Sequence, residues 1–542
     1  MLLDKVFGGF FKSPKATPVI ILFSVLIRVI SILVVAETDR DTLILAVQSK
    51  SLLDGNGLSV PKYYCDEINN PVFDFTPTWP AGYPLLLSPF LKIFNYDLFW
   101  AATSLELITC IFFIFLIRRI AVDLRLSLVA INILTIIAGC FNYEFIILNL
   151  PTDSPAFVIF LLGLFLLLKA VQNENFSAAK LLLVSFLLFL PCLFRYSYPP
   201  LSFAAFAGVA FTGWYLKKRV LIKKGIIGLT FFSILIIGFF FLSKKLTGTS
   251  SYIVDVGRGV FPKQLLDWAP IGPAAFIEPV FTTSQLMRIT HQSVQQTKLI
   301  LEIISDFMIA GLLFVFIYLF FWKRFFKSLD PFKWFLMIGF FISIATFISL
   351  GYLTLTYKPQ PGWGNYLGEH RYFVFVTLYL QIAFIGWVFL YPSWKKSILK
   401  KLIVFAFSLL LFIEITHSIY FNTKFILNFN KNRSVSFKDP DYVYFARLCK
   451  DLIQDNPDTE ILVASDNDEY FRLMASYLGQ KGIYDGLNLL NSVPEVKKNT
   501  ILILALYDNQ IPTYDSFLLL HNAQLIKNIN HANFYRINLY PK

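Results

Sequence analysis

The sequence predicts a polytopic α-helical membrane protein of about eleven transmembrane helices, followed by a small extracytoplasmic α/β domain at the C-terminal end. Of its 542 residues, 56% are hydrophobic and only 15% are charged, and the mean hydropathy is +0.61. Soluble domains do not have such a composition. Apolar runs of about 20 residues recur along the chain, and a helix of that length crosses a ~30 Å hydrocarbon core.

Each predicted span is an apolar run bounded by polar or basic residues. The spans lie at residues 17–36, 97–117, 125–144, 154–171, 180–195, 198–216, 225–243, 300–322, 334–356, 371–391 and 402–421. The Phe-rich, Lys-rich and Cys-poor composition favours the inner membrane of a bacterium.

The basic residues between the spans predict the orientation of the chain. Clusters that would all face one side include Lys12 and Lys15, Arg118 and Arg119, Lys217 and Lys218, Lys323 and Arg324, and Lys395 and Lys396. Among the short-loop clusters, only the pair Lys244-Lys245 falls on the other side. Because basic loops stay in the cytoplasm, we expect a cytoplasmic N-terminus and an extracytoplasmic C-terminus.

This orientation places three long segments on the outer side: residues 37–96, residues 244–299 and everything after about residue 421. We therefore divide the chain into a membrane domain, residues 1–421, and an outer domain, residues 422–542.

The outer domain combines two kinds of pattern. Strand-like runs occur at Glu460–Ala464 and Thr500–Leu506, and a helix-like run occurs at Tyr442–Ile453. Such a mixture predicts a small α/β fold.

The charge and cysteine content argue against a nucleic-acid-binding protein and against a disulfide-rich or zinc-binding protein. The formal net charge of +13 comes from loop clusters, not from one amphipathic face, so it indicates topology and no nucleic-acid partner. The five cysteines are scattered and odd in number, which gives neither a disulfide framework nor zinc-ligand spacing.

The most informative stretch follows the first span. Acidic residues Glu37, Asp39 and Asp41 lie at the water–membrane boundary and precede an apolar-patterned helix at 43–53. Residues 80–86 then read PAGYPLL, a rigid turn that opens a further apolar helix.

These motifs, in this order and on one side, resemble the first outer loop of the GT-C glycosyltransferases, which take sugars from polyprenyl-phosphate carriers. Among them, the chain is most similar to the protein O-mannosyltransferases, the lipid A aminoarabinose transferases and their bacterial relatives. The resemblance covers about residues 15–420. It implies a GT-C-like membrane domain and a sugar transferase, with a hexose or a pentose as the transferred group.

The resemblance also implies roles for particular residues. A first-loop Asp acts as the base, here Asp39 or Asp41, and a second acid stands at the outer start of a later helix, here Asp153. An Arg-Tyr pair begins a late helix, here Arg371-Tyr372. The first loop lacks the adjacent Asp-Glu pair that is commonest in the family, so the choice between the two candidate bases stays open.

The residues support this chemistry independently. Transfer needs a base for the acceptor hydroxyl and cations for the leaving phosphate. Arg371 and Arg195 are the main candidates for the phosphate, because a guanidinium pairs with phosphate bidentately, and His370 is a weaker one. Structural alternatives are an N-cap role for Asp153 and an interfacial anchor role for Arg371.

The sequence also predicts a buried ion pair and contains possible ligands for a metal ion. Arg28 and Glu106 lie at similar depth in the first two spans, so we expect a structural ion pair. Asp39, Asp41 and Asp153 are also suitable oxygen ligands for a divalent cation, which is the only cofactor that the sequence suggests and which it leaves unassigned.

Two other functional classes compete with the enzyme. A transporter needs a polar path near the midplane and symmetric broken helices, and a non-catalytic protein of envelope-polymer assembly would use the same scaffold. The enzyme hypothesis implies as partners a polyprenyl-phosphate-linked sugar donor, membrane lipids, and an envelope lipid, glycan or protein as acceptor.

Overall fold

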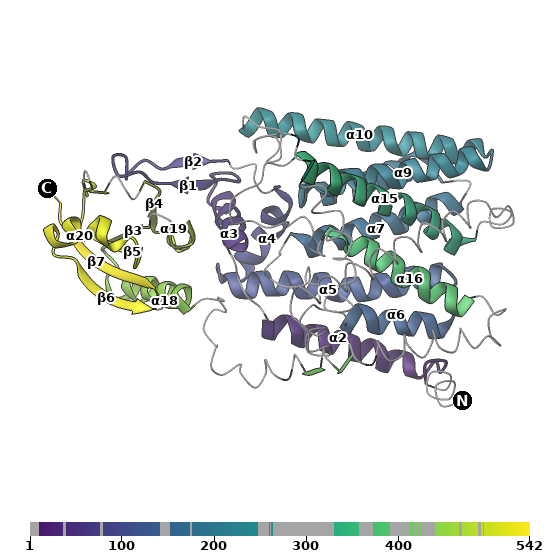
Figure 1. Cartoon of the computed structure of the whole chain (residues 1–542), viewed down its shortest axis with the longest axis horizontal. Coiled ribbons are helices and arrows are strands. Elements are labelled where there is room, and N and C mark those ends of the chain that lie inside the picture. Colours follow the sequence, from purple (N-terminus) through teal and green to yellow (C-terminus); the bar gives the residue numbers. More distant parts are fainter. Residues whose placement is uncertain are drawn as a thin grey trace. The chain divides into compact units, whose positions relative to one another are not determined.

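The computed structural model describes most of the chain (Figure 1). The described residues are 10–35, 40–75, 80–140, 152–173, 176–247, 330–356, 372–390, 440–465, 469–485, 493–529 and 531–541, with a few isolated positions between them.

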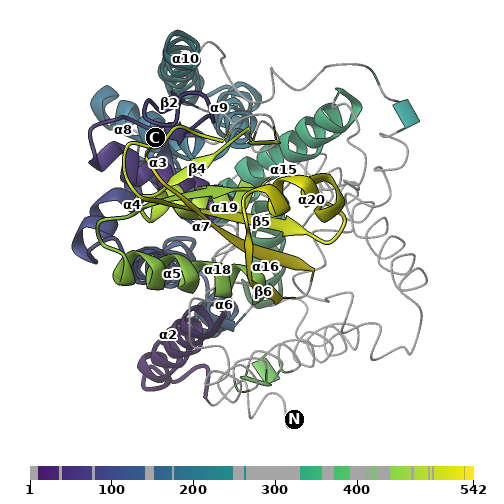
Figure 2. The same ribbon diagram turned by 90° about the vertical axis from the view of Figure 1, so that its left-hand side faces the viewer.

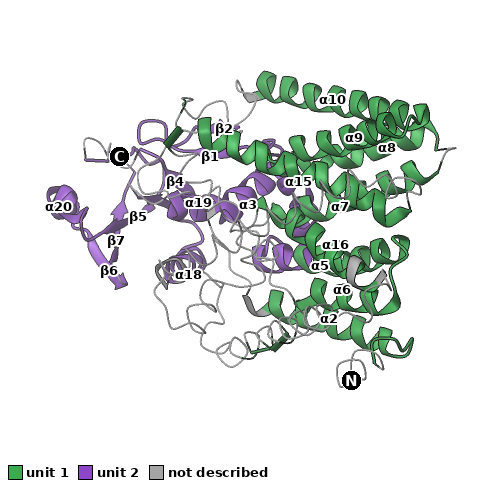
Figure 3. Cartoon of the chain, turned by 45° about the vertical axis from the view of Figure 1, so that its right-hand side comes forward, with its two compact units in different colours: residues 1–34, 106–146, 152–426 green, residues 35–105, 147–151, 427–542 purple. Residues whose placement is uncertain are grey.

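The chain forms two compact units, coloured separately in Figure 3. The first comprises residues 1–34, 106–146 and 152–426, and the second comprises residues 35–105, 147–151 and 427–542.

The first unit is a bundle of apolar helices. They are α2 (Ala16–Val35), α5 (Leu98–Asp123), which begins in the second unit, α6 (Leu128–Cys140), α7 (Asp153–Gln172), α8 (Ala178–Phe189), the 3₁₀ turn η2 (Leu190–Leu193), α9 (Tyr198–Tyr215), α10 (Arg219–Thr247), α15 (Pro331–Thr356) and α16 (Val374–Leu390). Helices α9, α10 and α15 lie side by side, as Figure 1 shows.

These helices coincide with predicted spans. By length and composition, α2, α7, α10 and α15 contain segments that are long and apolar enough to cross a membrane. The predicted span at 300–322 and most of that at 402–421 lie outside the described residues, so the total of about eleven stays a prediction.

Small residues let the helices of the bundle approach closely. A Cβ atom on Gly139 of α6 would lie 2.6 Å from the Cα of Ser24 in α2. On Gly225 of α10 it would lie 2.6 Å from the backbone nitrogen of Ala210 in α9. Lipid provides no hydrophobic driving force between helices, so this close packing stabilises the bundle.

The second unit begins with the first outer segment. Its elements are α3 (Arg40–Leu53), the antiparallel strands β1 (Val60–Lys62) and β2 (Val72–Asp74), and α4 (Gly82–Ile93). Helix α3 covers the helix predicted at 43–53, and α4 starts inside the turn predicted at 80–86.

The C-terminal part of this unit is an α/β fold, residues 440–541. Its helices are α18 (Pro440–Asp455), α19 (Glu469–Tyr477) and α20 (Ile511–Leu520), and its strands are β3 (Glu460–Ala464), β4 (Lys481–Ile483), β5 (Thr500–Tyr507), β6 (Gln524–Ile529) and β7 (Ala532–Leu539). The sheet order is β4-β3-β5-β7-β6. Strands β3, β4 and β5 run parallel, and β7 is antiparallel to β5 and β6.

Helices cover both faces of this sheet (Figure 2). Alternate side chains of a strand point to opposite faces. On one face, Phe534 of β7 packs with Phe445 of α18 and Phe471 of α19. On the other face, Leu504 and Ile537 share a core with Phe517 of α20. The strands and helix predicted for this region are therefore confirmed, and its extracytoplasmic location stays a prediction.

The first outer segment is built into this fold, although the sequence-based division assigned it to the membrane domain. Tyr63 forms a parallel bridge with Ile483, beside β4. The backbone N–H of Cys65 donates to Oδ1 of Asp485 at 3.0 Å.

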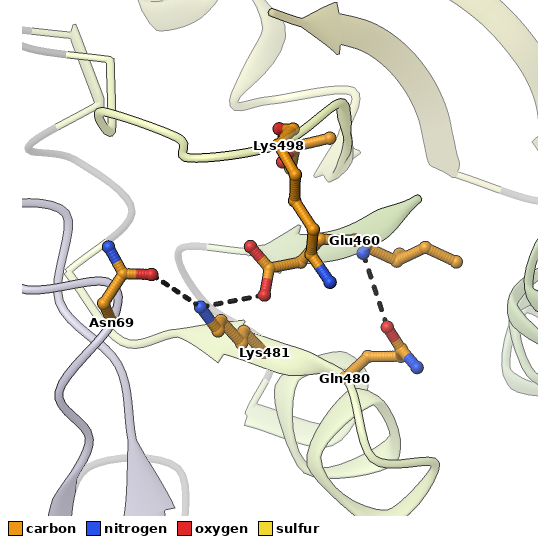
Figure 4. Close-up of polar contacts among 7 residues, drawn as sticks. Asn69, Glu460, Gln480, Lys481 and Lys498 are labelled. Atoms are coloured by element: carbon orange, nitrogen blue, oxygen red, sulfur yellow. Dashed lines mark hydrogen bonds and ion pairs between the residues drawn. The ribbon is translucent and has the colours of Figure 1, made fainter. Parts of the chain in front are cut away.

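A lysine also joins the outer segment to the sheet. The Lys481 ammonium contacts Oε1 of Glu460 at 2.9 Å and donates to Oδ1 of Asn69 at 3.2 Å (Figure 4). Residues distant in sequence thus form one unit, which an analysis of apolar runs does not detect.

Candidate active site

A buried ion pair lies in the first unit where α7 begins. Nε of Arg195 is 3.0 Å from Oδ1 of Asp153, and the two side chains are only 10% and 8% exposed. Arg195 follows the turn η2, and its backbone N–H donates to the carbonyl of Pro191 at 3.0 Å. This bond fixes the main chain of Arg195 at the end of the turn, from which its guanidinium reaches the start of α7.

Two further residues surround the guanidinium. Nη1 of Arg195 donates to Oγ1 of Thr152 at 3.4 Å. The centre of the guanidinium lies 5.5 Å from the centroid of the Tyr372 ring, an arrangement that attracts a cation to an aromatic ring. The structure thus brings together Asp153, Arg195 and Tyr372, three residues that the sequence analysis singled out from distant segments.

The structural alternative for Asp153 was an N-cap role, and the structure does not show it. The N-cap of α7 is Thr152, and Asp153 is the first helical residue. Its Oδ2 is buried and has no hydrogen-bond partner among the described residues. A buried oxygen of this kind destabilises the folded state unless a ligand, water or ion supplies a partner.

Arg195 keeps binding capacity beyond the pair. A guanidinium has five N–H donors in a fixed plane. Within the described part of the chain, two of them are used, by Asp153 and Thr152. The remaining donors are suited to an anion such as a phosphate, with Asp153 holding the plane in position.

The predicted pair Arg28–Glu106 lies near this cluster. Both side chains are buried, at 3% and 2% exposed, and the Glu106 carboxylate interacts electrostatically with both Arg28 and Asp153. Nη2 of Arg28 donates to the carbonyl of Ala138 at 3.1 Å, and the thiol of Cys110 donates to Oε1 of Glu106 at 3.3 Å. A direct ion pair between Arg28 and Glu106 stays a prediction.

Of the remaining candidate site residues, only Asp41 belongs to the described residues. Asp41 lies in the first turn of α3, in the second unit, where a carboxylate interacts favourably with the helix dipole. Asp39, His370 and Arg371 lie outside the described residues. In the described segments, no group of three His, Cys, Asp or Glu side chains is arranged to hold a metal ion.

Sequence reasoning missed Thr152 as a partner of Arg195. Its position beside Asp153 was the available signal, but the contact depends on a residue 43 positions later.

Comparison with known proteins identifies the fold. No family of sequences and no curated protein matches the chain. The structure of ArnT from Cupriavidus metallidurans bound to undecaprenyl phosphate has a TM-score of 0.52 at 9% identity, covering 96% of this chain and 98% of that one. Its apo structure gives 0.53 at 10% identity, with the same coverage. The apo oligosaccharyltransferase of Archaeoglobus fulgidus gives 0.53 at 12% identity, covering 92% and 70%.

The chain therefore has the fold of the GT-C glycosyltransferases, which are multi-pass membrane proteins. The recognition of that fold from the sequence motifs is confirmed. At such low identities the likeness concerns the fold alone, and activity must be argued from the chain's own residues.

Proposed function

We propose that this protein is an integral-membrane glycosyltransferase that moves a sugar from a polyprenyl-phosphate carrier to an extracytoplasmic acceptor. The observation that supports this most is the buried Arg195–Asp153 pair in a GT-C fold. A membrane protein rarely buries a guanidinium and a carboxylate without a functional reason. The structural neighbour ArnT binds undecaprenyl phosphate, which supports a lipid phosphate as the anion.

The proposed reaction is a direct displacement at the anomeric carbon. Asp39 or Asp41 takes the proton of the acceptor hydroxyl as its oxygen forms the new C–O bond. The bond between the anomeric carbon and the carrier phosphate breaks, and its electron pair leaves with the phosphate. Arg195 stabilises the negative charge that develops there, and Arg371, His370 and Tyr372 are proposed to contribute further contacts.

Asp153 has a positioning role in this scheme, because it orients Arg195. Its unpartnered Oδ2 is also a ligand of the type that a divalent cation accepts, so a cation remains part of the proposal, and no step of the reaction depends on it. We place the protein in the inner membrane of a bacterium, with the N-terminus in the cytoplasm and the acceptor on the outer side.

The test is transfer of labelled sugar from a polyprenyl-phosphate donor pool to cell-envelope acceptors by the purified full-length protein. Asp39→Asn and Asp41→Asn are compared with Asp515→Asn, which changes an exposed carboxylate on α20. We expect one of the first two variants to lose at least about 100-fold in rate, as general-base removal usually does, and the control to keep full activity.

Two outcomes contradict the proposal in different ways. Full activity of both Asp39→Asn and Asp41→Asn would refute the assignment of the base. Absence of transfer by wild-type protein across a broad donor panel would instead favour a transporter or a non-catalytic assembly protein.

A further inference from the structure

Helix α3 is buried on almost all sides, which is unusual for a short helix beside a membrane. Leu43, Leu45 and Ala46 are fully buried, and so are the polar Gln48 and Ser49, at no more than 2% exposed. The helix packs against α4 and α19 of the same unit. A helix that merely lies on a surface keeps its polar face in water, so α3 is held by protein on more than one side.

The C-terminus of α19 offers a specific attachment point. Gly479, at φ +80°, donates its N–H to the carbonyl of Ser476, and Gln480 donates to Ala475. This Schellman motif satisfies two of the last carbonyls of the helix. The carbonyl of Tyr477 comes next, and its partner is supplied from a different part of the chain.

That partner is Lys50, in the last turn of α3. Its ammonium donates to the Tyr477 carbonyl oxygen at 2.7 Å. A cation at a helix C-terminus is also favoured by the helix dipole. Burial lowers the pKa of Lys50, and the nearby Asp54 partly opposes this effect, so this ammonium is held in a confined place.

Tyr477 makes a second connection with its side chain. Its hydroxyl donates to the carbonyl of Tyr96 at 2.7 Å. Tyr96, at φ 63°, lies in the tight turn between α4 and α5. One residue of α19 therefore contacts both the end of α3 and the turn that leads into α5.

We propose that Lys50 is a positioning residue, which fixes α3 against Tyr477 of the C-terminal α/β fold and thereby orients the start of α3, where Asp41 lies. Asp41 is in the first turn of α3, and Asp39 is two positions earlier in the sequence. Lys50 comes nine positions after Asp41, about 14 Å along a helix axis. A rotation at one end of so short a helix moves the other end, and a displacement of about 1 Å can reduce a rate by about 100-fold.

This inference rests on the proposed function, because positioning matters only if one of these acids is the base. The first experiment compares full-length Lys50→Met and Lys50→Arg in the sugar-transfer assay. Lys527→Met is the matched control, since Lys527 of β6 lies over the ring of Tyr444 in α18. We expect Lys50→Met to lower kcat about tenfold with an unchanged KM for the donor, Lys50→Arg to recover part of the loss, and the control to equal wild type.

The second experiment does not depend on activity. Amide hydrogen exchange on the same proteins should become faster in residues 40–53 of Lys50→Met, and stay unchanged in α18 and α20. Unchanged exchange in α3, or wild-type kcat in Lys50→Met, would overturn the positioning role while leaving the proposed function intact. Faster exchange in a protein whose wild type transfers no sugar would refute the proposed function and leave Lys50 only as a structural attachment.

Discussion

Nε of Arg195 lies 3.0 Å from Oδ1 of Asp153, and neither side chain is more than 10% exposed. Removal of one partner leaves the other charge buried and uncompensated, which costs about 3–5 kcal/mol. We therefore expect Arg195→Ala to lower the free energy of unfolding by about this amount in detergent, measured by denaturant titration.

The double variant Asp153→Ala with Arg195→Ala should lose less stability than the sum of the two single variants, because no uncompensated charge remains. An additive result in this double-mutant cycle would contradict the pairing.

Arg195→Lys separates charge from geometry at the same site. Lysine keeps the charge and loses the planar fork that binds phosphate bidentately. We expect kcat to fall about tenfold, equivalent to about 1.4 kcal/mol of transition-state stabilisation, with a smaller rise in KM for the polyprenyl-phosphate donor. Arg447→Lys, at an exposed position of α18, should leave both constants unchanged.

Gly139→Ala tests the close contact of α2 and α6. The added Cβ would lie 2.5–2.8 Å from Ser24 atoms, too near for van der Waals contact, and such overpacking costs about 1–3 kcal/mol. The melting temperature in detergent should fall. Gly238→Ala is the matched control, because no atom of the described residues beyond the adjoining turns of α10 lies within 4 Å of its Cβ position. Equal effects of the two substitutions would show that the contact is not tight.

The thiol of Cys65 should resist alkylation. Burial raises its pKa to about 12, with Asp485 and Asp66 adding to the effect. The native state therefore keeps a proton that the unfolded chain releases above about pH 9, and this residue's contribution to stability falls as pH rises from about 9 to 12. Labelling with iodoacetamide at pH 8 should be slow in native protein and fast after denaturation; rapid native labelling would contradict this environment.

The apolar helices and the strands of the C-terminal α/β fold were predictable for local reasons. Crossing a bilayer requires a run of about 20 apolar residues, and this constraint is visible without knowledge of the neighbours. The same holds for the strands β3 and β5, whose apolar runs mark a buried sheet. The contact of Arg195 with Thr152 was not predictable, because it joins side chains 43 residues apart.

The grouping of the first outer segment with the C-terminal fold was not predictable either. Lys50 and Tyr477 are 427 residues apart, and neither belongs to a recognisable motif. A hydrogen bond at a helix terminus depends on which carbonyl the helix leaves unsatisfied. For α19, that carbonyl depends on the folded conformation of the helix C-terminus.

Hydropathy and turn motifs act over short stretches of chain, so the sequence alone was enough to predict the apolar helices of the described residues, the GT-C fold and the candidate polar residues. The pairing of Asp153 with Arg195 beside Tyr372, and the attachment of α3 to Tyr477 by Lys50, are visible only in the folded structure. Such pairings form because burial makes every unsatisfied polar group costly, and which groups become buried together is settled by the packing of distant segments.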